Sequence, residues 1–359
     1  VLGRFSFRVQ DREGQLRNEY LGGEYVDYKE SAAFQGRVTL TPADRWSVDL
    51  RAHYLDQDGG SGYFMPGSDF FLPLPPPNAP IIVDVPEYEI QSNRIGRSFV
   101  ESLEVSAKVD YAFDWGTLTS ITSFTDVDSG NDQDLDQTFV EAIDIVVIDE
   151  SETIAQEVRL VSSDDIAFRW VAGLSYFSQD RFRSLATTFL GTPVPAAAQD
   201  LRLENLAVFG NFSYDLNDQL ELTLAFRWDE ETPEDVTQGR STTFSELQPK
   251  ASLAYRFRDG LLGYVTVGKG FRAGGFNNLA PGSNFQPGFD KESLVSYETG
   301  LKGSGFDGRL RAGLSLFFID YTDQQFFLFD QTGTQANINI NKSEIAGGEF
   351  ELTALPSDN

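Results

Sequence analysis

Hydrophobic and polar residues alternate one by one along much of the chain. In one segment, the apolar residues Leu220, Leu222, Leu224, Phe226 and Trp228 occupy every second position, and mainly charged or hydroxyl-bearing residues stand between them. Successive side chains of a β-strand point to opposite faces, so this segment is predicted to be a strand with one apolar face. Three further segments show the same alternation: 46–54, 103–111 and 310–318. No stretch keeps a helical period for longer than two turns.

Short turns and long polar connections follow one another between the predicted strands. The short turns are rich in Gly, Pro, Asp and Asn, which favour tight turns, and they fall at 42–45, 114–116, 163–165, 217–218, 258–260, 303–308 and 356–359. The long connections span 13–31, 57–97, 128–151, 181–202, 230–245, 272–292 and 322–342. The repeating unit is therefore two strands, one short turn and one long loop, and the pattern predicts 14 strands.

This asymmetry of connections discriminates between three all-β architectures. A propeller would show four strands per repeat, and a soluble sandwich would not alternate short and long connections so strictly. An antiparallel transmembrane β-barrel has short turns at one end, long loops at the other and strands of about ten residues. It also accommodates charges in mid-strand, because its inward face borders a lumen, and such charges occur at Arg51, Lys108, Arg159, Arg227 and Lys302. We therefore predict an antiparallel transmembrane β-barrel.

The alternation also predicts which residues share a face of the barrel. The charged set is expected on the concave, inner face: Asp49, Arg51, Lys108, Asp110, Arg159, Arg227, Glu298 and Lys302. The apolar set is expected on the convex, outer face: Leu50, Val109, Leu224, Leu301 and Leu314. Trp46, Trp115 and Trp170 lie by the short turns and Trp228 lies by a long loop, a placement typical of aromatic girdles at the two membrane interfaces.

Composition excludes several other functions. The 359 residues include 28 Lys and Arg against 55 Asp and Glu, which gives a net charge of −27. Such a charge argues against a nucleic-acid partner, because phosphate binding requires a basic surface. The chain has no cysteine and a single histidine, His53, so disulfides, iron–sulfur clusters and zinc sites built on several histidines are excluded. No cofactor is expected.

A glycine-rich stretch at Gly263–Gly270 resembles a phosphate-binding loop in its spacing. Its final position holds Gly270 in place of the Ser or Thr that would bind magnesium, and no helix is predicted to follow. Phosphate loops depend on that helix N-terminus, so we predict no nucleotide site here. The chain also lacks a G-x-S-x-G motif and has only His53 as an imidazole, so we expect no enzymatic activity.

An acidic stretch between residues 109 and 158 contains 13 Asp and Glu and no Lys or Arg. Its dense part, from Asp126 to Asp136, could supply oxygen ligands for calcium. The calcium-loop template fails, because Gln137 stands where glycine is required and Ile143 where glutamate is required. A solvated outer loop is the expectation, and calcium binding stays open.

Two segments are candidates for ligand contact. Tyr63 and Phe64 begin an apolar, proline-rich stretch in a long loop, where aromatic rings can stack on a ligand or pack on the barrel mouth. Arg272, Phe276 and Asn277 lie in a glycine-rich stretch that leads from a strand into another long loop. Arg272 and Asn277 could donate hydrogen bonds to an anionic ligand, although the glycines themselves can be explained by backbone geometry alone.

Several motifs, in chain order, resemble those of TonB-dependent outer-membrane receptors. The most specific is residues 269–277, KGFRAGGFN, followed by residues 296–302, SYETGLK. Residues 320–325, DYTDQQ, and residues 346–352, AGGEFEL, are similar to the next two strands of that family. Upstream, residues 156–160 and 170–177 are similar to its middle strands.

The resemblance implies a 22-stranded barrel around an N-terminal plug, with a segment ahead of the plug that contacts TonB. Residues 1–359 are then expected to be part of the barrel domain, the third to sixteenth strands, without the plug and with six strands to follow. The implied function is active uptake of scarce ligands such as ferric siderophores across the outer membrane of a Gram-negative bacterium, by a monomer coupled to the TonB–ExbB–ExbD system through the plug. A complete, passive 14-stranded channel is the alternative.

Overall fold

The structure is a computed structural model and describes residues 1–62, 70–72, 81–83, 89–279, 282–329 and 335–355. The long strands are β1 (Leu2–Arg12), β4 (Lys29–Ala43), β5 (Trp46–Gly59), β9 (Arg97–Phe113), β10 (Gly116–Asp134), β11 (Ile143–Ser162), β12 (Phe168–Phe189), β13 (Thr192–Asp215), β14 (Leu220–Asp235), β16 (Phe244–Arg258), β17 (Leu261–Arg272), β20 (Glu292–Gly305), β21 (Leu310–Phe329) and β22 (Gln335–Ala354). The short strands are β2 (Arg17–Asn18), β3 (Glu24–Tyr25), β6 (Phe70–Leu72), β7 (Ile81–Val83), β8 (Glu89–Ile90), β15 (Arg240–Ser241), β18 (Gly275–Phe276) and β19 (Gly288–Phe289).

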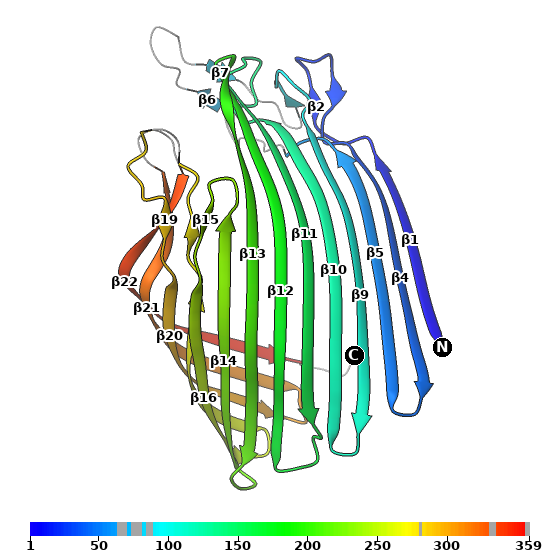
Figure 1. The fold of residues 1–359 in the computed structure, drawn as a ribbon, viewed down its shortest axis with the longest axis vertical. Coiled ribbons are helices and arrows are strands. Elements are labelled where there is room, and N and C mark those ends of the chain that lie inside the picture. The colour runs from blue at the N-terminus through cyan, green and yellow to red at the C-terminus, as the bar shows by residue number, and fades with distance from the viewer. Residues whose placement is uncertain (63–69, 73–80, 84–88, 280–281, 330–334, 356–359) are drawn as a thin grey trace.

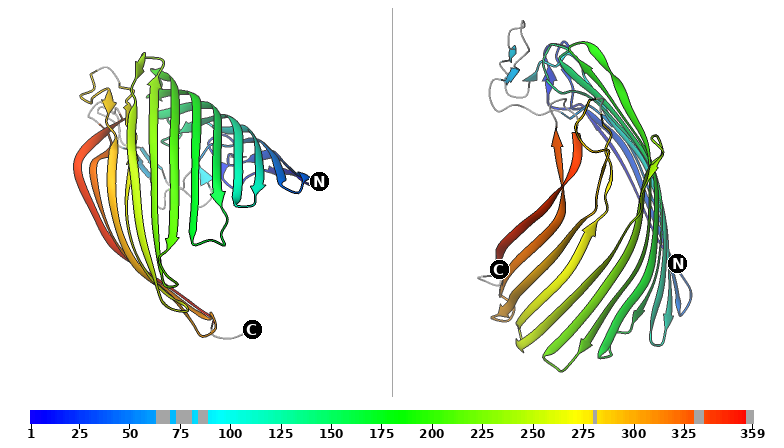
Figure 2. Two further views of the ribbon diagram at one scale, coloured as in Figure 1. Left: turned by 60° about the horizontal axis from the view of Figure 1, so that its bottom comes forward. Right: turned by 60° about the vertical axis from the view of Figure 1, so that its left-hand side comes forward.

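The long strands form one antiparallel sheet in which each strand pairs with the next in the chain. The order runs β1-β4-β5-β9-β10-β11-β12-β13-β14-β16-β17-β20-β21-β22, and β15 pairs with β14 beside this path. The sheet curves into an open trough whose first and last strands, β1 and β22, stand at its two edges (Figures 1 and 2). The predicted all-β antiparallel fold is confirmed, while the sheet does not close into a ring. Within the part of the chain described here, no helix is long and apolar enough to cross a membrane.

Six of the seven predicted short turns lie between strands where the sequence predicts them, and the seventh, 356–359, lies outside the described residues. Four of the seven long connections are shorter than predicted. Residues 181–202 were expected to form a loop, yet β12 and β13 continue through them and meet at a two-residue turn, Leu190-Gly191, with positive φ at both positions. The predicted loops 128–151, 230–245 and 322–342 are likewise entered by strands from both sides. In these segments apolar and polar residues do not alternate one by one: residues 145–148 of β11 are four apolar residues in succession, and residues 230–235 of β14 are polar apart from Pro233. Hydrophobic alternation therefore cannot reveal them, although their backbones pair as elsewhere.

The strand register confirms the predicted division of residues between two faces. Asp49 pairs with Lys108, Asp110 with Thr119, and Thr119 with Arg159. Directly paired residues share a face, and the register carried across the sheet places all eight predicted charged residues on one face and all five predicted apolar residues on the other.

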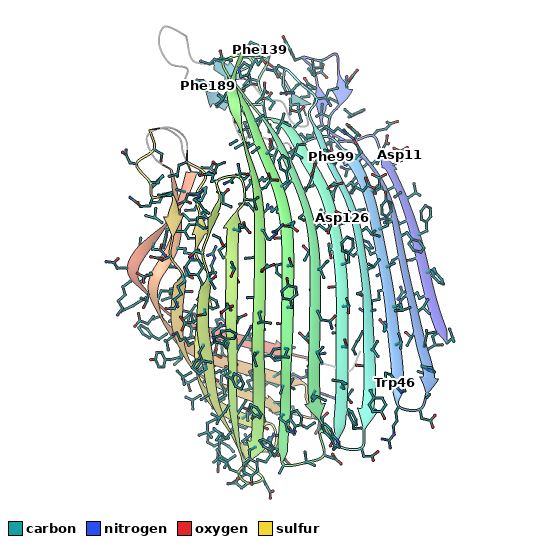
Figure 3. The ribbon with its side chains drawn as sticks, in the orientation of Figure 1. Asp11, Trp46, Phe99, Asp126, Phe139 and Phe189 are labelled. Atoms are coloured by element: carbon teal, nitrogen blue, oxygen red, sulfur yellow. The ribbon has the colours of Figure 1, made fainter. Side chains whose placement is uncertain are left out.

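Exposure distinguishes the two faces of the sheet. The apolar side chains are open, with Leu50, Leu224, Leu301 and Leu314 between 41% and 49% exposed, whereas Asp49 is 7% exposed. Side chains converge on the inner side of a curved sheet and diverge on its outer side, so the charged face is the inner one. The outer face therefore presents an apolar band to its surroundings. Figure 3 shows the side chains along the sheet, with Trp46 beside the short turns.

Aromatic rings line the outer face close to the short turns. Trp46, Tyr111, Phe113, Trp115 and Trp170 form an unbroken series with centroid separations of 4.7–6.1 Å. This series confirms the predicted clustering of three tryptophans at that end. The prediction for the fourth needs correction, because Trp228 lies in the middle of β14 and not beside a loop. The apolar band nevertheless ends there, since the next outward residue is Glu230.

Candidate functional site at the long-loop end

The glycine-rich stretch leaves the sheet at the end of β17. Gly274 is tightly enclosed there: an added Cβ would lie 2.2 Å from the carbonyl oxygen of Phe289 and 2.6 Å from the ring of Phe244. Gly270 has no such restriction, since the nearest atom would be 3.7 Å away. The chain then enters the small hairpin of β18 and β19, not a helix. This geometry excludes the phosphate-loop interpretation, as predicted, and explains Gly274 by close backbone approach.

Asn277 comes directly after β18, within this hairpin, and joins three segments of the chain. Its side-chain amide donates to the carbonyl oxygens of Gln286 at 3.0 Å and Asn337 at 2.9 Å, and its Oδ1 accepts the backbone N–H of Asn337 at 2.9 Å. The residue is 5% exposed. Both amide protons are therefore already used within the protein, and the geometry gives Asn277 a structural role. Its predicted contact with a ligand stays a prediction.

Arg240, the first residue of β15, contacts the same region. Its guanidinium lies 4.9 Å from the centroid of the Phe276 ring and donates to Asp235 Oδ2 at 2.6 Å and to the carbonyl oxygen of Pro287 at 2.8 Å. Asp235 is fully buried. We call Asp235, Arg240, Phe276 and Asn277 the mouth bracket. Sequence reasoning missed Asp235 and Arg240, because they lie in a predicted loop and only the folded chain brings them beside Phe276.

Arg272 differs from the mouth bracket because its charge is available. It is exposed, lies on the inward-facing positions of β17, and forms no ion pair with any residue that the structure describes. Its register partner Glu292 is occupied by the backbone N–H of Gln325 at 2.6 Å. Among the predicted ligand-contact residues that the structure describes, Arg272 is thus the one free to bind an anion. Tyr63 and Phe64 lie outside the described residues, and their predicted role stays a prediction.

The acidic stretch is partly buried, which corrects the expectation of a solvated loop. Asp134, Asp136 and Asp144 are each no more than 3% exposed. Asp134 Oδ1 accepts the backbone N–H groups of Asp136 and Gln137, and its Oδ2 accepts the Ser92 hydroxyl at 2.6 Å. Burial raises the pKa of Asp134 to about 6. Among the described residues, no group of three or more acidic side chains is arranged to hold a metal ion.

The inner face of the sheet is charged yet largely neutralised. Several cations pair with an acid two positions away on the same strand, so both side chains point inward: Arg227 with Asp229 at 2.8 Å, Arg159 with Glu157 at 2.9 Å, and Lys108 with Asp110 at 3.0 Å. On β17 and β20, Tyr264 donates to Glu298, and Lys302 lies 5.6 Å from the Tyr264 ring. Such a wall suits a hydrated or filled lumen, because these charges have partners.

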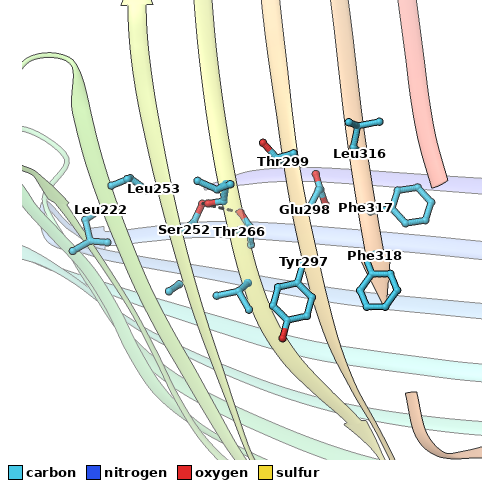
Figure 4. A pocket seen from close by; sticks show the side chains of 13 residues that line it. Leu222, Ser252, Leu253, Thr266, Tyr297, Glu298, Thr299, Leu316, Phe317 and Phe318 are labelled. Carbon is cyan, nitrogen blue, oxygen red and sulfur yellow. Dashed lines mark hydrogen bonds between the residues drawn. The ribbon is translucent and has the colours of Figure 1, made fainter. Parts of the chain in front are cut away.

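A hollow of about 590 Å³ lies between β16, β17, β20 and β21. Its walls are mostly outward-facing apolar residues, including Leu253, Val267, Tyr297, Leu316 and Phe318 (Figure 4). Tyr297 and Phe318 pack with centroids 6.4 Å apart. This hollow belongs to the apolar outer band, so its chemistry suits hydrocarbon and not a polar ligand.

Comparison with known proteins agrees with this architecture. The family model "TonB dependent receptor-like, beta-barrel" matches residues 3–355. The fold is similar to the ferric yersiniabactin uptake receptor FyuA from Yersinia pestis, with a TM-score of 0.74 and 15% identity over 98% of this chain and 53% of that one. It is also similar to the ferripyoverdine receptor of Pseudomonas aeruginosa, with a TM-score of 0.71 and 17% identity over 99% of this chain and 50% of that one.

A third solved structure, the siderophore receptor PiuA from Acinetobacter baumannii, has a TM-score of 0.68 and 14% identity over 99% of this chain and 57% of that one. The chain thus spans about half the length of the structures it matches. The family match extends over almost all of its residues, from the first long strand to the last. The chain belongs to the family of TonB-dependent receptor β-barrels.

Proposed function

We propose that this chain forms part of the barrel of an outer-membrane receptor that takes up scarce ligands, ferric siderophores in the first place, at the expense of energy delivered by TonB. The observation that carries the proposal is the strict division of the sheet into an apolar outer face and an inner wall of paired charges. A wall of this kind borders an aqueous or plug-filled lumen. The protein moves its ligand without chemical change, so no enzymatic step is proposed.

The whole protein is proposed to contain more than this sheet. The open edges at β1 and β22, and neighbours about twice as long as this chain, support a larger barrel of 22 strands with a plug inside it. Residues 1–359 would then contribute the third to sixteenth strands. The plug would connect the barrel to the TonB–ExbB–ExbD system, and the receptor would act as a monomer in the outer membrane of a Gram-negative bacterium.

Arg272 is proposed as a ligand-contact residue at the mouth. It combines exposure, an inward position and a charge without a described partner, and ferric siderophores commonly present oxygen donors of negative charge that a guanidinium binds well. Phe276 and Asn277 would act behind it by fixing the hairpin that follows. Tyr63 and Phe64 are proposed as aromatic contacts from the long loop after β5.

Uptake of a radiolabelled ferric siderophore by cells, with and without a protonophore, tests the proposal. An energised receptor should lose uptake when the proton-motive force collapses and should retain binding at the cell surface. A passive 14-stranded channel would keep its flux, because diffusion through an open lumen needs no coupling. Uptake unchanged by the protonophore would contradict the proposed function. Arg272→Gln should weaken surface binding, whereas the same substitution at the paired inner residue Arg227 should not.

A further inference from the structure

The inner wall carries one row of charges that is not neutralised like the others. Arg4 on β1 pairs in register with Arg37 on β4, and Arg37 pairs with Arg51 on β5. Strands lie about 4.8 Å apart, so three guanidinium-bearing side chains stand side by side on the same face. Like charges placed directly opposite each other destabilise a sheet. In a chain with a net charge of −27, such a row calls for a functional explanation.

One carboxylate orients two of these arginines. Asp49, whose side chain is 8% exposed, accepts the Nε–H of Arg37 at 2.6 Å and the Nε–H of Arg51 at 2.6 Å, and it also accepts the Thr39 hydroxyl at 2.9 Å. The arginine side chains themselves are 53% and 56% exposed. Asp49 accepts hydrogen bonds only from the Nε atoms of the two arginines. Their Nη groups form no hydrogen bond with any residue that the structure describes.

A comparison with Arg227 shows that this arrangement is unusual on the inner wall. Arg227 donates from both Nε and Nη2 to Asp229, at 2.8–3.0 Å, and so presents its fork to a carboxylate of its own strand. In the row, two arginines share the one carboxylate of Asp49. Arg4 is exposed and forms no ion pair within the described part of the chain. The row therefore keeps several charged donors for a partner from outside.

The donors border a hollow large enough for a small molecule. The hollow has a volume of about 720 Å³ and is lined by Arg4, Arg37 and Arg51. Its lining continues along β9 and β10 with Glu104, Ser106, Ser123 and Thr125. Small-molecule sites in proteins have volumes of about 300–1,000 Å³. Glu104 also lines the hollow, as the register partner of His53 on the strand beyond Arg51, and within the described part of the chain it forms no ion pair with the three arginines.

From this geometry we propose that Arg4, Arg37 and Arg51 form an inner-wall binding site for a small oxyanion ligand, one that bears several carboxylate or phosphate groups. Guanidinium forks bind such groups in a bidentate manner, and a donor pair held in place by Asp49 loses little entropy on binding. The site lies on the inner wall, below the mouth at which Arg272 stands, and it is distinct from the mouth bracket. If the proposed function holds, an anionic ligand binds at this site inside the barrel during its uptake.

Calorimetric titration of the purified protein in detergent micelles tests the site, with pyrophosphate as the phosphate probe and citrate as the carboxylate probe, at low salt. The wild-type protein should bind at least one probe saturably, at one site. Arg4→Gln removes no contact with a described residue and should weaken binding about tenfold, the effect of one lost charge-assisted hydrogen bond. Arg37→Gln should weaken it at least as much, since Asp49 keeps Arg51 and Thr39 as partners.

Arg227→Gln is the matched control, because it removes an inner-wall arginine whose fork is already occupied, and its affinity should stay within about twofold of wild type. Absence of saturable binding of both probes to the wild type would overturn the site. Equal affinity of wild type, Arg4→Gln and Arg37→Gln would overturn it too, as would an equal loss in Arg227→Gln. The titration needs neither TonB nor a proton-motive force, so its failure is distinguishable from failure of the proposed uptake function.

Discussion

The two halves of β14 are stabilised in different ways, although they belong to one continuous strand. From Leu220 to Trp228 the outward positions are all apolar, and this part belongs to the apolar band. From Asp229 to Asp235 both faces are polar, and we call this part the outer extension. Its contacts are directional, as in the buried pair of Asp235 and Arg240. The stability of the apolar band thus depends on the apolar medium around it, whereas the stability of the outer extension depends on specific partners within the protein.

This difference leads to opposite sensitivities to mutation. In the apolar band, a position tolerates many apolar residues but no charge, because lipid cannot solvate one. In the outer extension, an exposed position tolerates a charged residue. The loss of one buried hydrogen-bonding side chain, however, leaves the donor or acceptor that it contacted without a partner. The following predictions test this contrast, beginning with the largest expected effect.

Leu224→Arg should destabilise the folded protein in lipid by about 2–4 kcal/mol, the cost of an arginine at the midplane of a barrel's lipid face. Leu224 is 49% exposed on the outer face. Thr223→Arg, one residue earlier on the inner face, is the control and should cost far less. Denaturant unfolding in lipid vesicles measures both. Equal costs at the two positions would contradict the assignment of the faces.

Asn277→Ala should cost about 2–3 kcal/mol, because it leaves two carbonyl groups and one N–H without their partner. The loss should be local, so amide hydrogen exchange at Asn337, whose N–H is bonded to Asn277 at 2.9 Å, should accelerate. Asn278→Ala removes an exposed neighbour and serves as the control. Unchanged exchange at Asn337 would argue against the structural role of the mouth bracket.

The first two predictions also show what the sequence could and could not reveal. Alternation predicted the outer face around Leu224. An apolar residue stands at every second position there, so a register shifted by one residue would move the whole apolar set to the inner face. It could not reveal the mouth bracket, because Asn277 and Asn337 are 60 residues apart and neither carries a local signal. The burial of Asp134 was missed for the same reason: its partner Ser92 comes from another loop.

The contributions of Trp115 and Trp170 to the free energy of unfolding should be coupled by about 0.5–1.5 kcal/mol, the range for stacked ring pairs. Their centroids lie 6.1 Å apart with an interplanar angle of 25°. A double-mutant cycle on the two Ala variants measures the coupling through unfolding in vesicles. The pair of Trp115 and Trp228, at opposite ends of the apolar band, is the control and should be additive. No coupling between Trp115 and Trp170 would weaken the interpretation of the ring series as an interface girdle.

The smallest global effect is expected from the protonation of Asp134. Its pKa is raised from 3.8 to about 6, chiefly by burial, and burial also raises the pKa of the neighbouring Asp144. The folded state therefore binds a proton more tightly than the unfolded state, so the local structure gains stability as the pH falls below about 6, a gain that is complete near pH 4. Arg94, paired with Asp132 and Asp144, faces the same cluster.

Hydrogen exchange at the amides of Asp136 and Gln137, corrected for the intrinsic rate at each pH, should be slower at pH 5 than at pH 7. Both amides donate to Asp134 Oδ1. Asp134→Asn is the control: it keeps an oxygen acceptor, lacks the titrating group, and should flatten much of the pH dependence. Faster corrected exchange at pH 5 in the wild-type protein would contradict the assigned direction.

A cysteine scan along β14 tests the central claim most directly, and the natural chain offers a background without cysteine. Single cysteines from 220 to 235 would each carry a nitroxide spin label, and collisions with oxygen in lipid and with a water-soluble nickel complex would be compared in vesicles. The account predicts strict alternation from Leu220 to Trp228, with even-numbered positions exposed to lipid. From Glu230 onward, both faces should be accessible to the aqueous probe. A constant accessibility along residues 220–228, or alternation with odd-numbered positions in lipid, would contradict it.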